Sequence, residues 1–167
     1  VDGVMYFSAD DGTTGNELWR SDNTEAGTQR VADIFPGAGN SSPVELTPLT
    51  DTTFLFTAVS LVNNANIGRE LFVSDGTSAG TQLVEDIRPG GTSSQPKFLT
   101  QIKDGLVAFQ ANDGSNGQEL WISDGTAPGT FFVDINPGPG SSAPSNFVKG
   151  DGVVYFRAND GTSGVEP

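Results

Sequence analysis

The 167-residue chain contains no cysteine and no histidine. Without cysteine it cannot form a disulfide or offer a thiolate nucleophile. Without histidine it lacks Ser–His triads, imidazole general bases and most zinc sites. The missing cysteine does not identify the compartment, because oxidising surroundings permit disulfides without requiring them. These absences remove the commonest catalytic centres and favour a role outside catalysis.

Basic residues are scarce: 8 lysines and arginines stand against 21 aspartates and glutamates, which gives a formal net charge of -13. A chain of this charge repels phosphate backbones and anionic membrane surfaces, so we expect no nucleic-acid partner. Multivalent cations or a basic partner would be attracted. Long apolar runs are also missing, since none approaches about 18 residues, and we expect no membrane span.

Glycine and proline are abundant, with 22 and 10 copies, whereas hydrophobic residues make up 35% of the chain. This composition is typical of many short strands joined by tight turns. No segment shows an i, i+3, i+4, i+7 apolar pattern long enough for a helix. We therefore expect an all-β protein.

The sequence repeats itself with a period of about 50 residues. A glutamate recurs at spacings of 53, 49 and 47 residues, and a phenylalanine lies 10 residues before it, except in the second copy, where the separation is 14. The glutamates are Glu17, Glu70, Glu119 and Glu166, and the phenylalanines are Phe7, Phe56, Phe109 and Phe156. The second copy thus carries a four-residue insertion around residues 61–66, where we expect a surface loop. The repeats span residues 1–49, 50–101 and 102–148, and a partial fourth spans 149–167.

A turn sequence follows each glutamate strand, and it carries a resemblance. The second and third copies read ELFVSDGTSAGT from Glu70 and ELWISDGTAPGT from Glu119. These segments resemble the ELWxxDGT repeat family of large secreted or surface bacterial proteins, and the repeat covers essentially the whole chain. The first copy departs from the pattern because Asn23 replaces the glycine, but asparagine tolerates the left-handed conformation that the turn needs. The resemblance implies a propeller-like architecture and an extracellular or cell-surface location, and it implies no reaction.

Each repeat offers four strand-length segments separated by turn residues. In the third copy they are 106–111, 119–123, 130–135 and 146–148. We expect tandem four-stranded antiparallel repeats that form blades of a β-propeller, three complete and one partial. Residues 153–157 would then be a strand of the fourth blade without partners, and an unpaired apolar strand promotes association. This predicts self-association, head to tail into a filament, or further repeats of the same chain.

The Asp-Gly turns allow two interpretations. Aspartate can cap the local backbone N–H groups while glycine supplies a positive φ, which is the interpretation we favour. Alternatively, the carboxylates bind calcium, a hard cation that prefers oxygen ligands, although the spacing does not match an EF-hand. The calcium candidates are Asp11, Glu17, Asp75, Asp113, Glu119, Asp124 and Asp160. The repeated glutamate favours a scaffold role, since a catalytic residue is needed once and a structural one in every repeat.

Two further features have a structural and a functional interpretation. The residues two positions after the glutamates, Trp19, Phe72 and Trp121, would pack between blades or, alternatively, form a ladder on which sugars stack. Asn40 begins Asn40-Ser41-Ser42, the only N-x-S/T sequon, and is a candidate for N-glycosylation.

The sequence therefore predicts an extracellular structural or adhesive repeat module without enzymatic activity. The alternative is a carbohydrate- or protein-binding propeller that uses the insertion around residues 61–66 and neighbouring loops. A carboxylate-dependent hydrolase is a third hypothesis.

Overall fold

The computed structural model describes residues 3–150 and 153–167, and this part of the chain is entirely β-structure. Its strands form four antiparallel sheets, as the sequence predicts for an all-β fold of tandem repeats. Sheet 1 contains β1 (Met5–Asp10), β2 (Asn16–Ser21) and β3 (Gln29–Ala32). Sheet 2 contains β4 (Val44–Pro48), β5 (Phe54–Val62), β6 (Ala65–Ser74) and β7 (Gln82–Glu85). Sheet 3 contains β8 (Lys97–Lys103), β9 (Leu106–Asn112), β10 (Gln118–Ser123) and β11 (Phe131–Val133), and sheet 4 contains β12 (Ser145–Lys149), β13 (Val154–Asn159) and β14 (Val165–Glu166).

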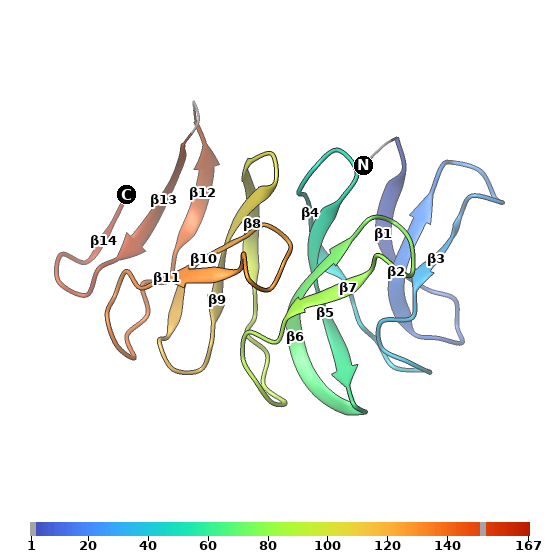
Figure 1. Ribbon diagram of the computed structural model, residues 1–167, viewed down its shortest axis with the longest axis horizontal. Helices are drawn as coiled ribbons and strands as arrows, with labels where there is room; N and C mark the ends of the chain where they lie inside the picture. The colour runs from blue at the N-terminus through green and yellow to red at the C-terminus, as the bar shows by residue number, and fades with distance from the viewer. Residues whose placement is uncertain (1–2, 151–152) are drawn as a thin grey trace.

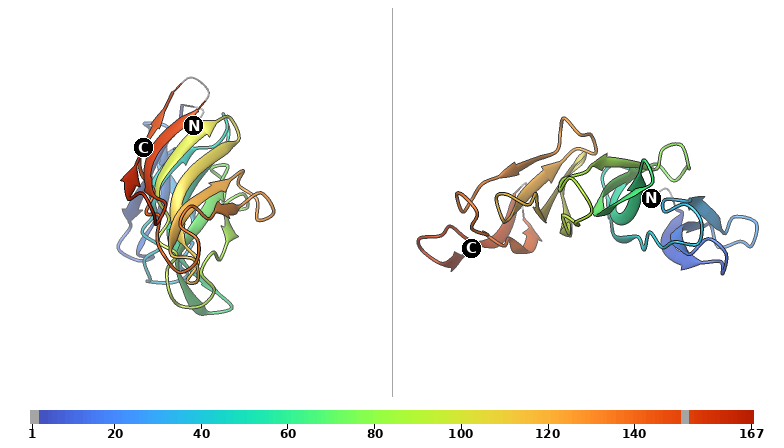
Figure 2. Two further views of the ribbon diagram at one scale, coloured as in Figure 1. Left: turned by 90° about the vertical axis from the view of Figure 1, so that its left-hand side faces the viewer. Right: turned by 90° about the horizontal axis from the view of Figure 1, so that it is seen from below.

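The four sheets follow one another in chain order. Figure 1 shows them in a row, from sheet 1 (blue) to sheet 4 (red). Figure 2 shows from below that the row curves and that its two ends stay apart. Within the described residues there is no helix that is long and apolar enough to cross a membrane.

The sheets are offset by one strand from the sequence repeats. β4 lies in the first repeat but pairs with β5 of the second, and the same offset recurs at β8 and β12. The reason is turn length: the Leu49 N–H donates to the Thr53 carbonyl at 2.9 Å and closes a tight turn. Residues 33–43, by contrast, form a long Pro- and Gly-containing loop that crosses from β3 to the next sheet. The described chain therefore has two four-stranded sheets between two three-stranded ones, rather than three complete blades and a partial one.

The prediction of an unpaired strand at residues 153–157 is wrong. β13 lies between β12 and β14, with Ser145 opposite Arg157 and Asn159 opposite Val165. The residues of β12 belong to the third sequence repeat, so the repeat boundaries separated β13 from its first neighbour.

The insertion in the second repeat lengthens a hairpin instead of forming a loop. β5 and β6 have 9 and 10 residues, and their pairing continues to Val62 opposite Ala65. Asn63 and Asn64 form the turn with φ values of 51° and 63°. Two consecutive residues with positive φ are what a two-residue hairpin turn of type I′ requires, and asparagine tolerates this conformation.

The hydrophobic core lies between neighbouring sheets. Two of these interfaces are centred on a fully buried phenylalanine, Phe56 between sheets 1 and 2 and Phe109 between sheets 2 and 3. Phe72 and Trp121 are buried in the same two clusters, which confirms the predicted packing role for these two rings. Their faces are not available as a sugar-stacking ladder, and Trp19, on sheet 1, is half-buried.

Candidate functional site

The repeated glutamate is buried and holds the crossing loop in place. Glu70 has no exposed surface. Its Oε1 accepts the Ser94 N–H at 2.8 Å, and its Oε2 accepts the Ser94 hydroxyl at 2.5 Å and the Ile87 N–H at 3.1 Å. The Ser94 carbonyl in turn accepts the Asn112 N–H of sheet 3 at 3.0 Å. One serine thus joins the carboxylate of sheet 2 to β9 of sheet 3.

We call this arrangement the Glu–Ser clamp, and it occurs three times in the described residues. The pairs are Glu17–Ser41, Glu70–Ser94 and Glu119–Ser142. The next isoleucine donates its N–H to the carboxylate in each case, from Ile34, Ile87 and Ile135. The scaffold role predicted for the glutamate agrees with these bonds, but its serine partner was not predicted from the sequence. The recurrence of serine 23 or 24 residues after each glutamate was the signal that could have found it.

Among the described residues, no lysine or arginine pairs with the clamp carboxylates. The only ion pair in residues 3–150 and 153–167 joins Arg30 to Asp33 at 3.7 Å. Burial raises the pKa of Glu17, and it raises the pKa of Glu70 to about 7 despite the opposing hydrogen bonds from Ser94. A carboxyl group with a pKa near 7 is chemically a proton donor or acceptor, but here its oxygens already serve backbone and hydroxyl donors.

The aspartates of the DGT turns fold the turn onto itself. The Asp75 Oδ1 accepts the N–H and the hydroxyl of Thr77 at 2.8 and 2.7 Å, and the Thr77 hydroxyl oxygen accepts the Gly80 N–H at 3.0 Å. The hydroxyl of Thr77, followed by its N–H, lowers the pKa of Asp75. Asp124 makes the same bonds with Thr126. Both calcium candidates therefore act as turn-forming residues.

The aspartates of the other Asp-Gly turns, in the hairpins, have a similar role. The Asp11 Oδ1 accepts the N–H groups and hydroxyls of Thr13 and Thr14, which lower its pKa. Asp113 accepts the N–H groups of Ser115 and Asn116 at 2.8 Å each. The Ser163 and Thr162 N–H groups lower the pKa of Asp160 to about 2. These bonds agree with the capping interpretation of the turns.

The structure does not bring the calcium candidates together. Glu17 and Glu119 lie in clamps, and the five aspartates lie in separate turns. In the part of the chain that the structure describes, no three acidic side chains converge in a metal-binding group. Calcium binding stays a prediction from the sequence.

Asn40, the glycosylation candidate, is exposed and has a structural partner. Its Oδ1 accepts the Asn16 N–H at 2.7 Å. At the equivalent positions the hydroxyl oxygens of Ser93 and Ser141 accept the Arg69 and Gln118 N–H groups at 2.9 and 3.0 Å. The asparagine thus does what serine does in the other repeats, and N-glycosylation stays a prediction.

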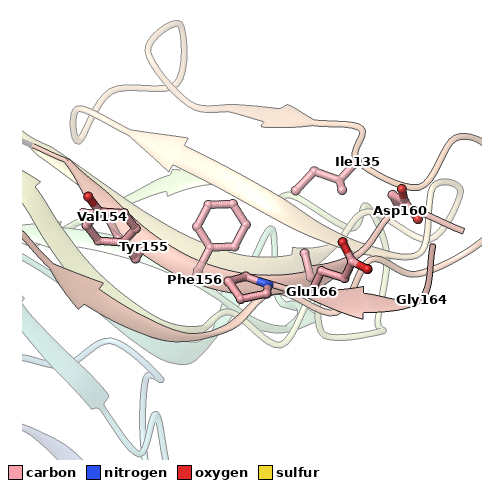
Figure 3. A pocket seen from close by; sticks show the side chains of 9 residues that line it. Ile135, Val154, Tyr155, Phe156, Asp160, Gly164 and Glu166 are labelled. Carbon is pink, nitrogen blue, oxygen red and sulfur yellow. The ribbon is translucent and has the colours of Figure 1, made fainter. Parts of the chain in front are cut away.

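The interface between sheets 3 and 4 is less fully buried than the interfaces between sheets 1 and 2 and between sheets 2 and 3. A cavity of about 370 Å³ lies there, and Figure 3 shows Ile135, Phe156 and Glu166 around it. In the interior interfaces the equivalent isoleucines and phenylalanines are buried together with Phe72 or Trp121. Phe156 and Ile135 are only half-buried.

The outer faces of the first and last sheets expose large side chains. Tyr155 of β13 is 64% exposed, whereas the residue at the same place in β5, Leu55, is fully buried. Met5 of β1 is 56% exposed, whereas its equivalents Phe54 and Val107 are at most 2% exposed. Positions that form the core in sheets 2 and 3 are therefore open in sheets 1 and 4.

Comparison of the chain with protein-family models finds no matching family, and no curated protein matches it.

Proposed function

We propose that the chain is an extracellular structural or adhesive module whose sheets are stacked like propeller blades and continue head to tail. A further sheet of the same type, from a second copy of this chain or from further repeats, would cover each open face. The repetition of one interface supports this proposal, together with the resemblance to secreted repeat proteins.

The contact between Tyr6 and Phe54 carries the argument. Tyr6 of sheet 1 packs on Phe54 of sheet 2 with ring centroids 4.5 Å apart. Tyr155 immediately precedes Phe156 as Tyr6 precedes Phe7, and Met5 stands two residues before Phe7 as Phe54 stands before Phe56. If sheet 4 docks on sheet 1 of another copy as sheet 1 docks on sheet 2, then Tyr155 meets Met5.

The two open faces differ, so the contact is heterologous. Alternate residues of a strand point to opposite faces, which places Met5 on the face of sheet 1 away from sheet 2 and Tyr155 on the face of sheet 4 away from sheet 3. A heterologous contact that does not close produces a filament, and one that closes produces a ring. Both outcomes suit a structural role outside the cell.

The absence of cysteine allows a clean cross-linking test. We expect the double variant Met5→Cys/Tyr155→Cys, treated with a short bismaleimide, to form a ladder of covalent oligomers. Each single variant should stop at dimers. As a matched control, Val62→Cys/Tyr155→Cys places one thiol at a hairpin end that belongs to neither open face. If the control forms the same ladder, head-to-tail docking through these residues is wrong.

Analytical sedimentation tests the same proposal without covalent cross-linking. Tyr155→Asp introduces a charge at the proposed contact, and we expect it to shift the chain toward smaller species than Val62→Asp does. An unmodified chain that stays monomeric at every concentration would contradict the proposal.

A further inference from the structure

A second cavity lies at the edge shared by sheets 2 and 3, where β4 and β8 are neighbours (Figure 1). Its volume is about 410 Å³, within the range of small-molecule sites. Residues of three separate segments line it: Val44, Glu45, Arg69, Ser93, Gln95, Pro96, Lys97 and Phe98. We call it the Arg69 groove.

The charge of the Arg69 groove is opposite to that of the chain. Two of the 8 basic residues, Arg69 and Lys97, line it. Neither forms an ion pair within the described ranges, where the only such pair joins Arg30 and Asp33. Glu45 is the only acidic residue of the lining, and its Oε2 accepts the Leu99 N–H at 3.1 Å. The groove therefore holds a local excess of positive charge.

Arg69 is held in place by the scaffold. Its Nη1 donates to the carbonyl and the hydroxyl oxygen of Thr57 at 3.0 and 3.2 Å, and its side chain is half-buried. Burial lowers the pKa of Arg69, which still stays charged at neutral pH. Among the described residues, Nε and Nη2 have no hydrogen-bond partner, so these donors remain for a ligand.

Phe98 presents an aromatic ring that the fold does not require. It is 44% exposed and has a φ of 62°. Glu45 and Asn146 occupy the equivalent positions with φ values of 61° and 57°. The strand register shifts at all three positions, so this β-bulge forms without an aromatic residue. A bulky residue is strained in this conformation, and an exposed ring gains little burial in return.

We propose that the Arg69 groove binds an acidic sugar, a pyranose that carries a carboxylate or sulfate group. The anionic group pairs with Arg69 and Lys97, and the ring stacks on Phe98. The hydroxyl of Ser93, whose oxygen accepts the Arg69 N–H, and the amide of Gln95 are available for sugar hydroxyls. This site does not depend on the head-to-tail docking proposed above.

The charge distribution limits the size of the ligand. The net charge of -13 repels a long polyanion, whereas the groove attracts an anion only over a Debye length of about 8 Å at physiological salt. The groove can therefore attract a single acidic sugar, or the end of a short acidic oligosaccharide, without strong repulsion from the rest of the chain. The exposed ring of Phe98 and the polar groups of Ser93 and Gln95 match the C–H face and the hydroxyl groups of a pyranose, which makes a sugar the better match than an acidic peptide.

The repeats themselves supply the test variants. The third copy has Gln118, Ser145 and Asn146 where the groove has Arg69, Lys97 and Phe98. Arg69→Gln, Lys97→Ser and Phe98→Asn therefore place residues that the same backbone already accommodates.

The direct measurement is a titration of the ¹⁵N-labelled chain with D-glucuronate, followed by NMR. D-glucose is the control for a sugar without charge, and acetate and inorganic sulfate are the controls for an anion without a sugar ring. We expect glucuronate to shift the amides of Arg69 and of residues 93–98, glucose to shift none, and acetate and sulfate to bind at least about tenfold more weakly. Equal binding of glucuronate and glucose would overturn the proposal, as would equal binding of glucuronate and acetate.

The variants assign the binding to the groove. Each should weaken glucuronate binding, by at least about tenfold for Arg69→Gln, and Lys97→Ser and Phe98→Asn should not lower the melting temperature. Lys149→Gln removes a charge from β12, outside the lining, and should leave binding unchanged. If Arg69→Gln unfolds because it loses Thr57, Lys97→Ser and Phe98→Asn decide the outcome, and undiminished binding in both would sink the assignment.

Discussion

At the scale of single residues, the clamp glutamates place a carboxylate in the protein interior without a cation. Burying a charge is unfavourable unless hydrogen bonds replace the lost water. Glu70 receives three such bonds, two from Ser94 and one from Ile87. Each hydrogen bond to a charged group contributes about 1.5–3 kcal/mol. The raised pKa of Glu70 indicates that these bonds offset only part of the desolvation cost.

The raised pKa predicts how stability depends on pH. Folded Glu70 keeps its proton up to a pKa of about 7, whereas an unfolded glutamate loses it near 4.5. Between these values the unfolded chain binds fewer protons, so the free energy of unfolding falls as pH rises. We expect a loss of up to about 3 kcal/mol from Glu70 alone, measured by urea unfolding at a series of pH values.

Glu70→Gln removes this titration and should flatten the curve in the same window. The exposed Glu25→Gln is the matched control and should leave the slope unchanged. Stability that rises with pH between about 5 and 7 would contradict the assignment of a raised pKa to this carboxyl group.

At the scale of elements, the DGT turn owes its shape to a network of short polar side chains. The Ser74 and Thr81 hydroxyls are 2.8 Å apart and join the two ends of the turn. The Asp75 carboxylate lies directly against Gly80, where a Cβ atom would overlap it. The second glycine of the motif is therefore needed for close approach, not for a positive φ.

Gly80→Ala tests this requirement. The added methyl group must displace Asp75 and disturb its bonds to Thr77, which should cost about 1–3 kcal/mol. Gly91→Ala is the control, because a Cβ atom at this exposed position would lie at ordinary van der Waals distance from its nearest neighbour. Surface substitutions of this kind usually change the free energy of unfolding by no more than about 0.5 kcal/mol. Thermal unfolding of the two variants gives the comparison, and equal melting temperatures would refute the close-approach argument.

At the scale of the whole molecule, stability comes from faces that meet between sheets. Leu55 and Leu71 of sheet 2 pack against Phe109 and Trp121 of sheet 3, and the two rings of sheet 3 lie 6.3 Å apart. Because the row of sheets does not close on itself, an inner sheet is covered on both faces and an end sheet on one.

Trp121→Ala and Trp19→Ala compare these two environments with the same chemical change. Trp121 is buried between sheets, and its loss should cost about 3–5 kcal/mol. Trp19 is half-buried on sheet 1, and its loss should cost markedly less in dilute solution. Urea unfolding measures both, and similar losses would place Trp19 in an equally closed environment.

The strands, the absence of helix and the buried aromatics were predictable because they depend on local composition and alternation. The strand partners were not predictable, because nothing in the sequence of a segment such as Val44–Pro48 indicates which neighbouring strand it pairs with. The length of the turn after it decided the pairing. The Arg69 groove could not be predicted either, because it unites Glu45, Arg69 and Lys97 from segments about twenty or more residues apart.

The one-strand offset between repeats and sheets has a consequence for how such a chain can grow. A tandem duplication of about 50 residues, wherever its ends fall, inserts one donor strand and one three-stranded acceptor in register. The new copy receives the first strand of its sheet from its predecessor and donates its own last strand to the sheet of its successor. Gene duplication therefore lengthens the array without ever passing through an ancestor with a broken sheet in its interior.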